Sequence, residues 1–277
     1  MVAGGVVYVG SDDGKLYAIG ARSGEQRWAR PLDAPLGWSS PVLIGDSLYV
    51  NSGDERQQSL HRIDAANGVQ RWKYTIPVPQ PPFRPASAIW GPAVAEGVAF
   101  VGCDDGNLYF VDAARGKQLG KFRAAAGKAF WRPAFADGAV YVGSDDGNVY
   151  AIDAKLREKR WSKPIASTKR VASTPLVVGS TVYVGSDDRR VYALAAADGR
   201  ELWKADTSGM IRTRPAAADG TVYVSSADGR LYAFRATDGT ERWKSVRLGG
   251  ALWSSPVVAD GIVYVGSDDK GLYAVTA

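Results

Sequence analysis

VYVGSDDGKLYAI, at residues 7–19, recurs almost unchanged as VYVGSDDGNVYAI at residues 140–152. Its first tyrosine has an equivalent in seven places along the chain: Tyr8, Tyr49, Phe100, Tyr141, Tyr183, Tyr223 and Tyr264. Successive equivalents are 41, 51, 41, 42, 40 and 41 residues apart. A period of about 40 residues is typical of repeat architectures, in which each unit covers the apolar face of its neighbour. The sequence therefore predicts seven copies of one structural unit.

Each copy contains two segments that we expect to be β-strands joined by a tight turn. VYVGS and KLYAI alternate large apolar residues with small or polar ones, the period-two pattern of strands. Asp and Gly in the intervening S-D-D-G suit a hairpin turn. The second segment has its own aromatic position, occupied by Tyr17, His61, Tyr109, Tyr150, Tyr192, Tyr232 and Tyr273. Because the lone histidine replaces a tyrosine here, we interpret His61 as structural and not as a general base.

Two further segments complete the unit. One carries tryptophan after a turn that usually contains glycine, at Trp28, Trp72, Trp161, Trp203 and Trp243. The other contains proline, at Pro41, Pro92, Pro133, Pro175, Pro215 and Pro256. Four strands per copy predict an all-β fold, a seven-bladed β-propeller of four-stranded antiparallel blades that forms a single domain over residues 1–277. The first copy lacks the proline segment and the last lacks the tryptophan segment, so we expect both blades to be incomplete and the natural chain to begin upstream of Met1.

The run D-A-x-x-G-x-x-x-W from Asp64 to Trp72, together with VYVGSDDGxLYA and SSPVV, resembles the PQQ-like repeat of quinoprotein alcohol dehydrogenases and their non-catalytic relatives. For the enzymes, the resemblance implies a tricarboxylate quinone stacked on tryptophan, near calcium and a catalytic aspartate, often beside two adjacent cysteines. This chain has a single cysteine, Cys103, and no clustered set of calcium ligands is evident in its sequence. The departures favour the non-catalytic branch, with the PQQ-dependent dehydrogenase as the alternative.

Acidic pairs recur in the S-D-D-G turns, where they admit two interpretations. They lie at Asp12-Asp13, Asp104-Asp105, Asp145-Asp146, Asp187-Asp188 and Asp268-Asp269. A catalytic dyad needs one pair at one place, and calcium needs six to eight oxygens converging on one point. Pairs distributed over different blades satisfy neither requirement. We therefore interpret them as turn residues and expect no catalytic residue and no metal site.

Basic and aromatic residues gather in the connections that lead from a tryptophan segment to the next proline segment. These connections contain eleven Lys and Arg but only Asp33 and Asp206 as acids, and each of the four tryptophans outside the main tryptophan position precedes a proline. Guanidinium groups bind carboxylate or phosphate, and indoles stack on flat groups. The predicted ligand-binding funnel comprises Trp38, Trp90, Trp131, Arg132, Arg170, Arg212, Arg214 and Trp253. The competing interpretation is an aromatic plug of a central channel.

The proline-rich connection at residues 74–90 belongs to the same face, and it is predicted to be either a lid or a spacer. We expect the protein to be a non-catalytic sensor or scaffold that binds an anionic small molecule or an acidic protein segment and needs no cofactor. PQQ with calcium is the cofactor of the alternative. A net charge of +5 over 277 residues is too mild to favour nucleic acid. The sequence contains no apolar run of 18 residues, so we expect no membrane insertion by this chain. The family resemblance favours an extracytoplasmic domain if a signal segment lies upstream.

Overall fold

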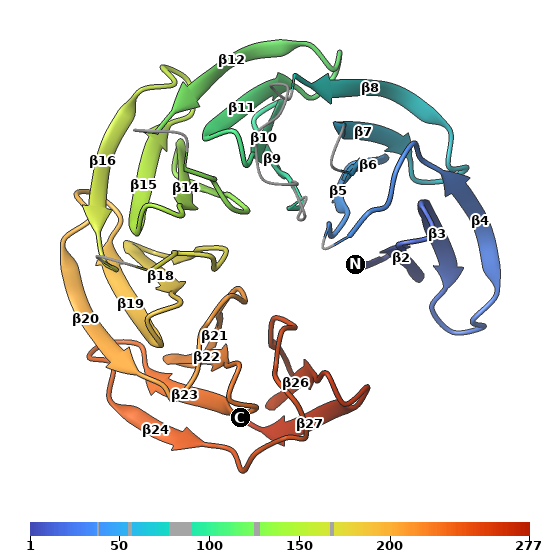
Figure 1. Cartoon of the computed structure of the whole chain (residues 1–277). Helices are drawn as coiled ribbons and strands as arrows, with labels where there is room; N and C mark the ends of the chain where they lie inside the picture. The colour runs from blue at the N-terminus through green and yellow to red at the C-terminus, as the bar shows by residue number, and fades with distance from the viewer. Residues whose placement is uncertain (38, 55–56, 78–89, 125–127, 167–168) are drawn as a thin grey trace. The chain divides into compact units, whose positions relative to one another are not determined.

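The structure is a computed structural model that describes residues 1–37, 39–54, 57–77, 90–124, 128–166 and 169–277. The chain divides into two compact units, Met1–Phe130 and Trp131–Ala277. Every element in the described ranges is a β-strand, and the strands form seven antiparallel sheets (Figure 1). The fold is the predicted seven-bladed β-propeller. Each sheet is one blade, and blades are numbered below in chain order.

The first unit contains three four-stranded blades. Blade 1 is ordered β1 (Val2–Ala3), β2 (Val6–Gly10), β3 (Lys15–Gly20) and β4 (Gln26–Pro31). Blade 2 is ordered β5 (Val42–Ile44), β6 (Ser47–Gly53), β7 (Gln58–Asp64) and β8 (Gln70–Ile76). Blade 3 contains β9 (Ala93–Ala95), β10 (Val98–Gly102), β11 (Asn107–Asp112) and β12 (Gln118–Arg123).

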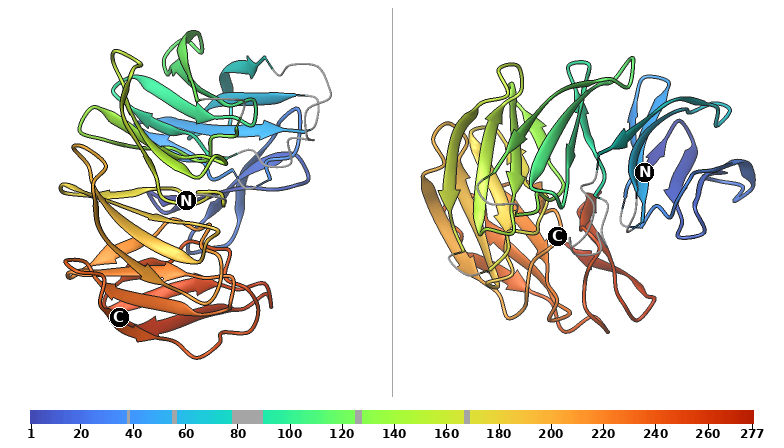
Figure 2. Two further views of the ribbon diagram at one scale, coloured as in Figure 1. Left: turned by 60° about the vertical axis from the view of Figure 1, so that its left-hand side comes forward. Right: turned by 45° about the horizontal axis from the view of Figure 1, so that its top comes forward.

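The second unit contains the remaining four blades, whose sheets lie side by side in both views of Figure 2. Blade 4 is β13 (Ala134–Ala136), β14 (Ala139–Gly143), β15 (Asn148–Asp153) and β16 (Lys159–Pro164). Blade 5 is β17 (Leu176–Val178), β18 (Thr181–Gly185), β19 (Arg190–Ala195) and β20 (Glu201–Asp206). Blade 6 is β21 (Ala216–Ala218), β22 (Thr221–Ser225), β23 (Leu231–Arg235) and β24 (Glu241–Lys244). Blade 7 has three strands, β25 (Val257–Ala259), β26 (Ile262–Gly266) and β27 (Leu272–Thr276).

The expectation of incomplete first and last blades is confirmed for the last blade and wrong for the first. Blade 7 lacks the tryptophan strand, whereas blade 1 has four strands because β1 pairs with β2. Gly4 and Gly5 adopt φ values of 55° and 71°, which glycine reaches without steric cost, so the chain reverses within two residues. Proline is therefore not required for the first strand of a blade.

Tryptophan and tyrosine join consecutive blades within each unit. The Trp161 indole nitrogen and the Tyr141 hydroxyl both donate to the Ala196 carbonyl of the next blade, at 2.9 and 3.3 Å. The indole also covers Gly199, where a Cβ atom would lie 2.6 Å from the ring. The same paired donation occurs from Trp28 and Tyr8 to Ala65, from Trp72 and Tyr49 to Ala113, and from Trp203 and Tyr183 to Ala236. This contact explains why tryptophan recurs in the fourth strand.

The second aspartate of each S-D-D-G turn has a structural role. The Tyr150 hydroxyl donates to Asp146 Oδ2 at 2.6 Å, while the Asn148 backbone N–H donates to Asp146 Oδ1 at 3.0 Å. Burial and the Asp146 hydrogen bond raise the pKa of Tyr150, so the phenol stays protonated. The same tyrosine-to-aspartate bond joins Tyr17 to Asp13, Tyr109 to Asp105, Tyr192 to Asp188, Tyr232 to Asp228 and Tyr273 to Asp269. The aspartate therefore fixes the hairpin, as predicted.

We expect Asp146→Asn to lower the free energy of unfolding by only about 1 kcal/mol, the usual effect of weakening a turn or capping bond. The amide keeps one acceptor oxygen, and the Tyr150 hydroxyl can accept as well as donate. Asp12→Asn is the matched control, because Asp12 is exposed and makes no hydrogen bond in the described part of the chain. Urea denaturation measures both variants. A loss above 3 kcal/mol, or a melting temperature that rises steeply with calcium, would contradict the turn role.

Candidate functional site

The second unit brings six of the eight predicted funnel residues onto segments that precede the first strands of its blades. Trp131 and Arg132 precede β13, Arg170 precedes β17, and Arg212 and Arg214 precede β21. Trp253 precedes β25. These six residues are called the basic cluster below.

The other two predicted residues are not part of this unit. Trp90 lies in the first unit, where it is half-buried and its carbonyl accepts a hydrogen bond from Asn51 Nδ2 at 2.6 Å. Trp38 and residues 78–89 of the proline-rich connection lie outside the described residues. The candidate site is therefore described for the second unit alone.

Arg212 is held between an acid and an indole. Its Nε and Nη2 atoms donate to the two carboxylate oxygens of Asp187 at 2.7 and 2.9 Å, a bidentate pair. The guanidinium lies over the Trp253 ring, 5.6 Å from its centroid, within the range of a cation–π interaction. The Asp187 side chain is 7% exposed and that of Arg212 is 33% exposed. The Asp187 hydrogen bond raises the pKa of Arg212, so the Arg212 guanidinium stays charged.

Two further contacts place acidic turns inside the basic cluster. The Trp131 indole nitrogen donates to Asp145 Oδ1 at 2.7 Å. Arg170 lies 3.8 Å from Asp187 through Nε, and its carbonyl accepts from the Asp187 backbone N–H at 3.0 Å. Asp187 of the blade 5 turn therefore compensates Arg170 and Arg212, whereas Asp145 of the blade 4 turn holds Trp131.

Arg132 and Arg214 differ from Arg212 because neither guanidinium has an ion pair or a side-chain hydrogen bond among the residues described. They occupy the same position in blades 4 and 6, directly before Pro133 and Pro215. Desolvation lowers the pKa of both side chains, and the positive charge of Arg214 lowers that of Arg132 further. The charge of Arg214 thus acts on Arg132, and neither guanidinium is neutralised by an acid among the described residues.

Serine and threonine hydroxyl groups fix the segment that carries Arg214. Ser173 Oγ donates to the Thr213 carbonyl at 2.8 Å, and Ser225 Oγ contacts Thr213 Oγ1 at 3.0 Å. The Arg214 backbone N–H donates to Ser255 Oγ at 3.0 Å, which ties blade 6 to blade 7. The peptide group between Thr213 and Arg214 is therefore held at both its carbonyl and its N–H.

Asp145 and Asp187 are members of the site that sequence reasoning missed, because it interpreted every acidic pair as a turn. Only the second aspartate of each pair bonds the tyrosine. A signal was present in blade 6, where Ala227 replaces the first aspartate and the turn still forms. The first aspartate was therefore available for another role.

The calcium that accompanies PQQ would need several oxygen ligands converging on one point. The residues described contain no group of three or more His, Cys, Asp or Glu residues arranged to hold a metal ion. Both carboxylate oxygens of Asp187, which lies beside the cluster's arginines, accept hydrogen bonds from Arg212. Within the described ranges, no helix is long and apolar enough to span a membrane.

Comparison with known proteins identifies relatives along the whole chain. A family model described as outer membrane protein assembly factor BamB matches residues 1–121, 83–205 and 187–277. BamB of Yersinia pestis is 31% identical over 125 residues, which cover 43% of this chain and 30% of that protein. Tetrathionate hydrolase of Acidithiobacillus ferrooxidans is 24% identical over 144 residues, covering 43% of this chain and 27% of the hydrolase. The match therefore spans less than a third of each of these two relatives.

Solved structures share the fold. BamB from Moraxella catarrhalis superposes with a TM-score of 0.79 at 21% identity, covering 99% of this chain and 82% of that one. A quinohemoprotein alcohol dehydrogenase from Pseudomonas putida HK5 superposes with a TM-score of 0.73 at 16% identity, covering 95% of this chain and 61% of the enzyme. Because one propeller fold serves both a dehydrogenase and an assembly factor, these likenesses support the fold and not a function.

Proposed function

Because this chain belongs to the family described as outer membrane protein assembly factor BamB, we propose that it is a non-catalytic interaction scaffold whose basic cluster binds an acidic segment of a partner protein. The family description also favours an extracytoplasmic location. The observation that carries the binding proposal is the contrast between compensated and uncompensated arginines. Arg212 is already paired with Asp187, whereas Arg132 and Arg214 have no acidic partner among the described residues.

The compensated and uncompensated arginines have separate roles in this proposal. Arg132 and Arg214 bind a carboxylate of the partner, since guanidinium groups bind carboxylates through paired hydrogen bonds. Arg212 and Trp253 form a flat platform beside them, on which a side chain or a peptide group of the same segment packs. A partner segment with a carboxylate next to a planar or apolar group fits both parts.

We expect Arg132→Ala combined with Arg214→Ala to weaken binding of an acidic peptide about tenfold, equivalent to ~1.4 kcal/mol. Hexaglutamate is a suitable probe, hexaglutamine its neutral counterpart, and tryptophan fluorescence the readout because Trp131 and Trp253 belong to the cluster. The affinity of the wild-type protein for hexaglutamate should fall as the salt concentration rises, because salt screens the attraction between solvent-exposed charges. Citrate and pyrophosphate test whether a small anion binds as well as the peptide.

The matched control is Lys155→Ala combined with Lys159→Ala, which removes the same charge from exposed residues around the β15–β16 turn. Equal weakening by the two double variants would show only a general charge effect and would contradict the site. Failure of any anion to bind would leave the cluster as an aromatic plug. Oxidation of an alcohol in a dye-linked assay with PQQ and calcium would overturn the non-catalytic assignment.

A further inference from the structure

The residue two positions after the first tyrosine of each repeat distinguishes two of the blades from the other five. Blade 2 has Asn51 at this position, and blade 6 has Ser225, the last residue of β22. Both side chains are almost fully buried, with 1% and 0% of their surface exposed. Since buried polar groups are hydrogen-bonded, each of them needs a partner. The other five blades have glycine there, as Gly10, Gly102, Gly143, Gly185 and Gly266.

Glycine at this position lets the connection of the next blade lie directly against the strand. A Cβ atom at Gly143 would lie 2.2 Å from the Val171 carbonyl oxygen, and one at Gly185 would lie 2.2 Å from the Ile211 side chain. Both separations are far below the roughly 3.5 Å at which non-bonded atoms make optimal contact. Because Ser225 carries a Cβ atom, the connection that follows it must lie farther from its strand than these two connections lie from theirs. Ser225 therefore sets the spacing between β22 and the connection to blade 7.

The Ser225 hydroxyl joins the two connections that carry the platform of the basic cluster. It donates to the Ser254 carbonyl at 2.6 Å, because a carbonyl oxygen can only accept. It also lies 3.0 Å from Thr213 Oγ1, and the Thr213 hydroxyl donates to the Ser225 carbonyl at 3.2 Å. Thr213 follows Arg212 in the sequence, and Ser254 follows Trp253. One serine side chain therefore links the backbone next to Arg212 with the backbone next to Trp253.

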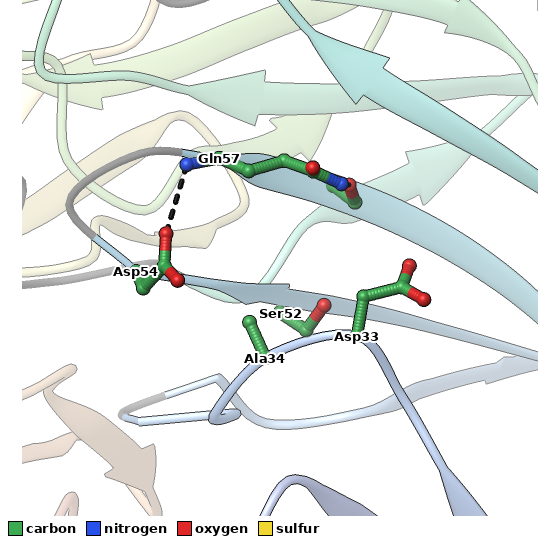
Figure 3. A pocket seen from close by; sticks show the side chains of 6 residues that line it. Asp33, Ala34, Ser52, Asp54 and Gln57 are labelled. Atoms are coloured by element: carbon green, nitrogen blue, oxygen red, sulfur yellow. Dashed lines mark hydrogen bonds between the residues drawn. The ribbon is translucent and has the colours of Figure 1, made fainter.

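Blade 2 makes the equivalent contact in the first unit. Asn51 Nδ2 donates to the Trp90 carbonyl at 2.6 Å, and Trp90, like Ser254, is the second residue before the proline of its connection. Successive strand residues point to opposite faces of a sheet, so Asn51 faces away from the polar pocket that Ser52 lines (Figure 3). The two polar residues thus bind the same carbonyl of the next blade, and each holds a connection that carries tryptophan.

We propose that Ser225 is a positioning residue that holds Trp253 against Arg212, and that this platform selects a partner segment in which an aromatic residue adjoins the acidic ones. The inference rests on the proposed function and names the partner more narrowly. The Arg212 guanidinium lies over the indole, 5.6 Å from its centroid, and both side chains remain partly exposed. Aromatic rings stack on guanidinium and indole faces. Arg132 and Arg214 bind the neighbouring carboxylates of the same segment.

Two peptides of equal length and charge, EEFEEFEE and EEAEEAEE, test the proposal when the whole chain is titrated and tryptophan fluorescence is followed. We expect the wild type to bind the phenylalanine peptide about fivefold more tightly, the size expected of one aromatic pair. Ser225→Gly should remove this preference. It should leave affinity for the alanine peptide unchanged, because Ser173 and Ser255 still hold the peptide group before Arg214. The variant should fold, since glycine occupies this position in five other blades.

Further variants separate this inference from the proposed function. Ser225→Asn should restore the preference, because Asn51 makes the equivalent bond in blade 2. Arg132→Ala combined with Arg214→Ala should weaken both peptides alike and leave the ratio of the two affinities unchanged. In the free protein, Ser225→Gly should shift the ¹H–¹⁵N NMR signal of the Arg212 Nε–H group.

Equal binding of the two peptides by the wild type would overturn the inference and leave the proposed function standing. The same holds if Ser225→Gly keeps the preference or leaves the Arg212 signal in place. Binding of neither peptide would overturn the proposed function and this inference with it.

Discussion

Trp161→Ala should lower the free energy of unfolding of the second unit by about 4 kcal/mol, within the range measured for removal of large core aromatics. Trp161 is 8% exposed, packs against Tyr141 with ring centroids 5.9 Å apart, and donates to the Ala196 carbonyl. Its removal also uncovers Gly199, which the indole now covers. Alanine would therefore leave a cavity at the junction of blades 4 and 5 and remove the shorter of the two hydrogen bonds to the Ala196 carbonyl.

Trp243→Ala is the matched control, because Trp243 occupies the same position in blade 6. Its ring packs similarly on Tyr223, with centroids 5.9 Å apart, but the indole is only half-buried and donates no hydrogen bond among the described residues. We expect a loss of about 2 kcal/mol, from the buried part of the ring alone. Urea denaturation followed by circular dichroism measures both. Equal losses would show that contact with the next blade contributes little.

Much of the fold could be predicted from the sequence because each repeat carries several signals that agree. The tyrosine spacing, the S-D-D-G turns and the recurring tryptophan all indicate the same strands, and all are local features. The first blade shows where this reasoning fails. Pro41 and its equivalents mark the first strand in other blades, but the physical requirement is a tight reversal, which Gly4 and Gly5 supply. A missing proline was therefore mistaken for a missing strand.

The candidate site could be predicted only in part. The distribution of charged residues along the sequence identifies the segments that carry the arginines, but it does not identify which side chains form ion pairs. The sequence groups Arg132, Arg212 and Arg214 because they occupy equivalent positions, just before the first strands of their blades. The pairing of Arg212 with Asp187 joins residues 25 positions apart on different blades, and only the geometry of the two blades shows it. The interpretation of His61 as structural agrees with its complete burial and with its hydrogen-bond contacts to Ser52 and Gln70.

Asp187→Asn is expected to change stability and binding in opposite directions. The amide offers one acceptor in place of two and points an N–H group toward the Arg212 guanidinium. Breaking a buried ion pair costs about 3–5 kcal/mol, but Arg212 is one-third exposed, so we expect a loss of about 2–3 kcal/mol. The variant also leaves Arg212 uncompensated beside Trp253. Affinity for hexaglutamate should therefore rise about tenfold at low salt, and the gain should shrink as salt screens the added charge.

Asp188→Asn controls for damage to the same turn. Asp188 bonds the Tyr192 hydroxyl at 2.5 Å and the Arg190 N–H at 3.1 Å, and it makes no contact with Arg212 in the described structure. It should cost about 1 kcal/mol of stability and leave peptide affinity unchanged. If Asp187→Asn weakens peptide binding together with stability, then Asp187 orients Arg212 for the ligand and does not compete with it. In that case Arg212, which Asp187 neutralises, would bind the peptide together with Arg132 and Arg214. Arg212→Ala would then weaken binding as much as Arg132→Ala.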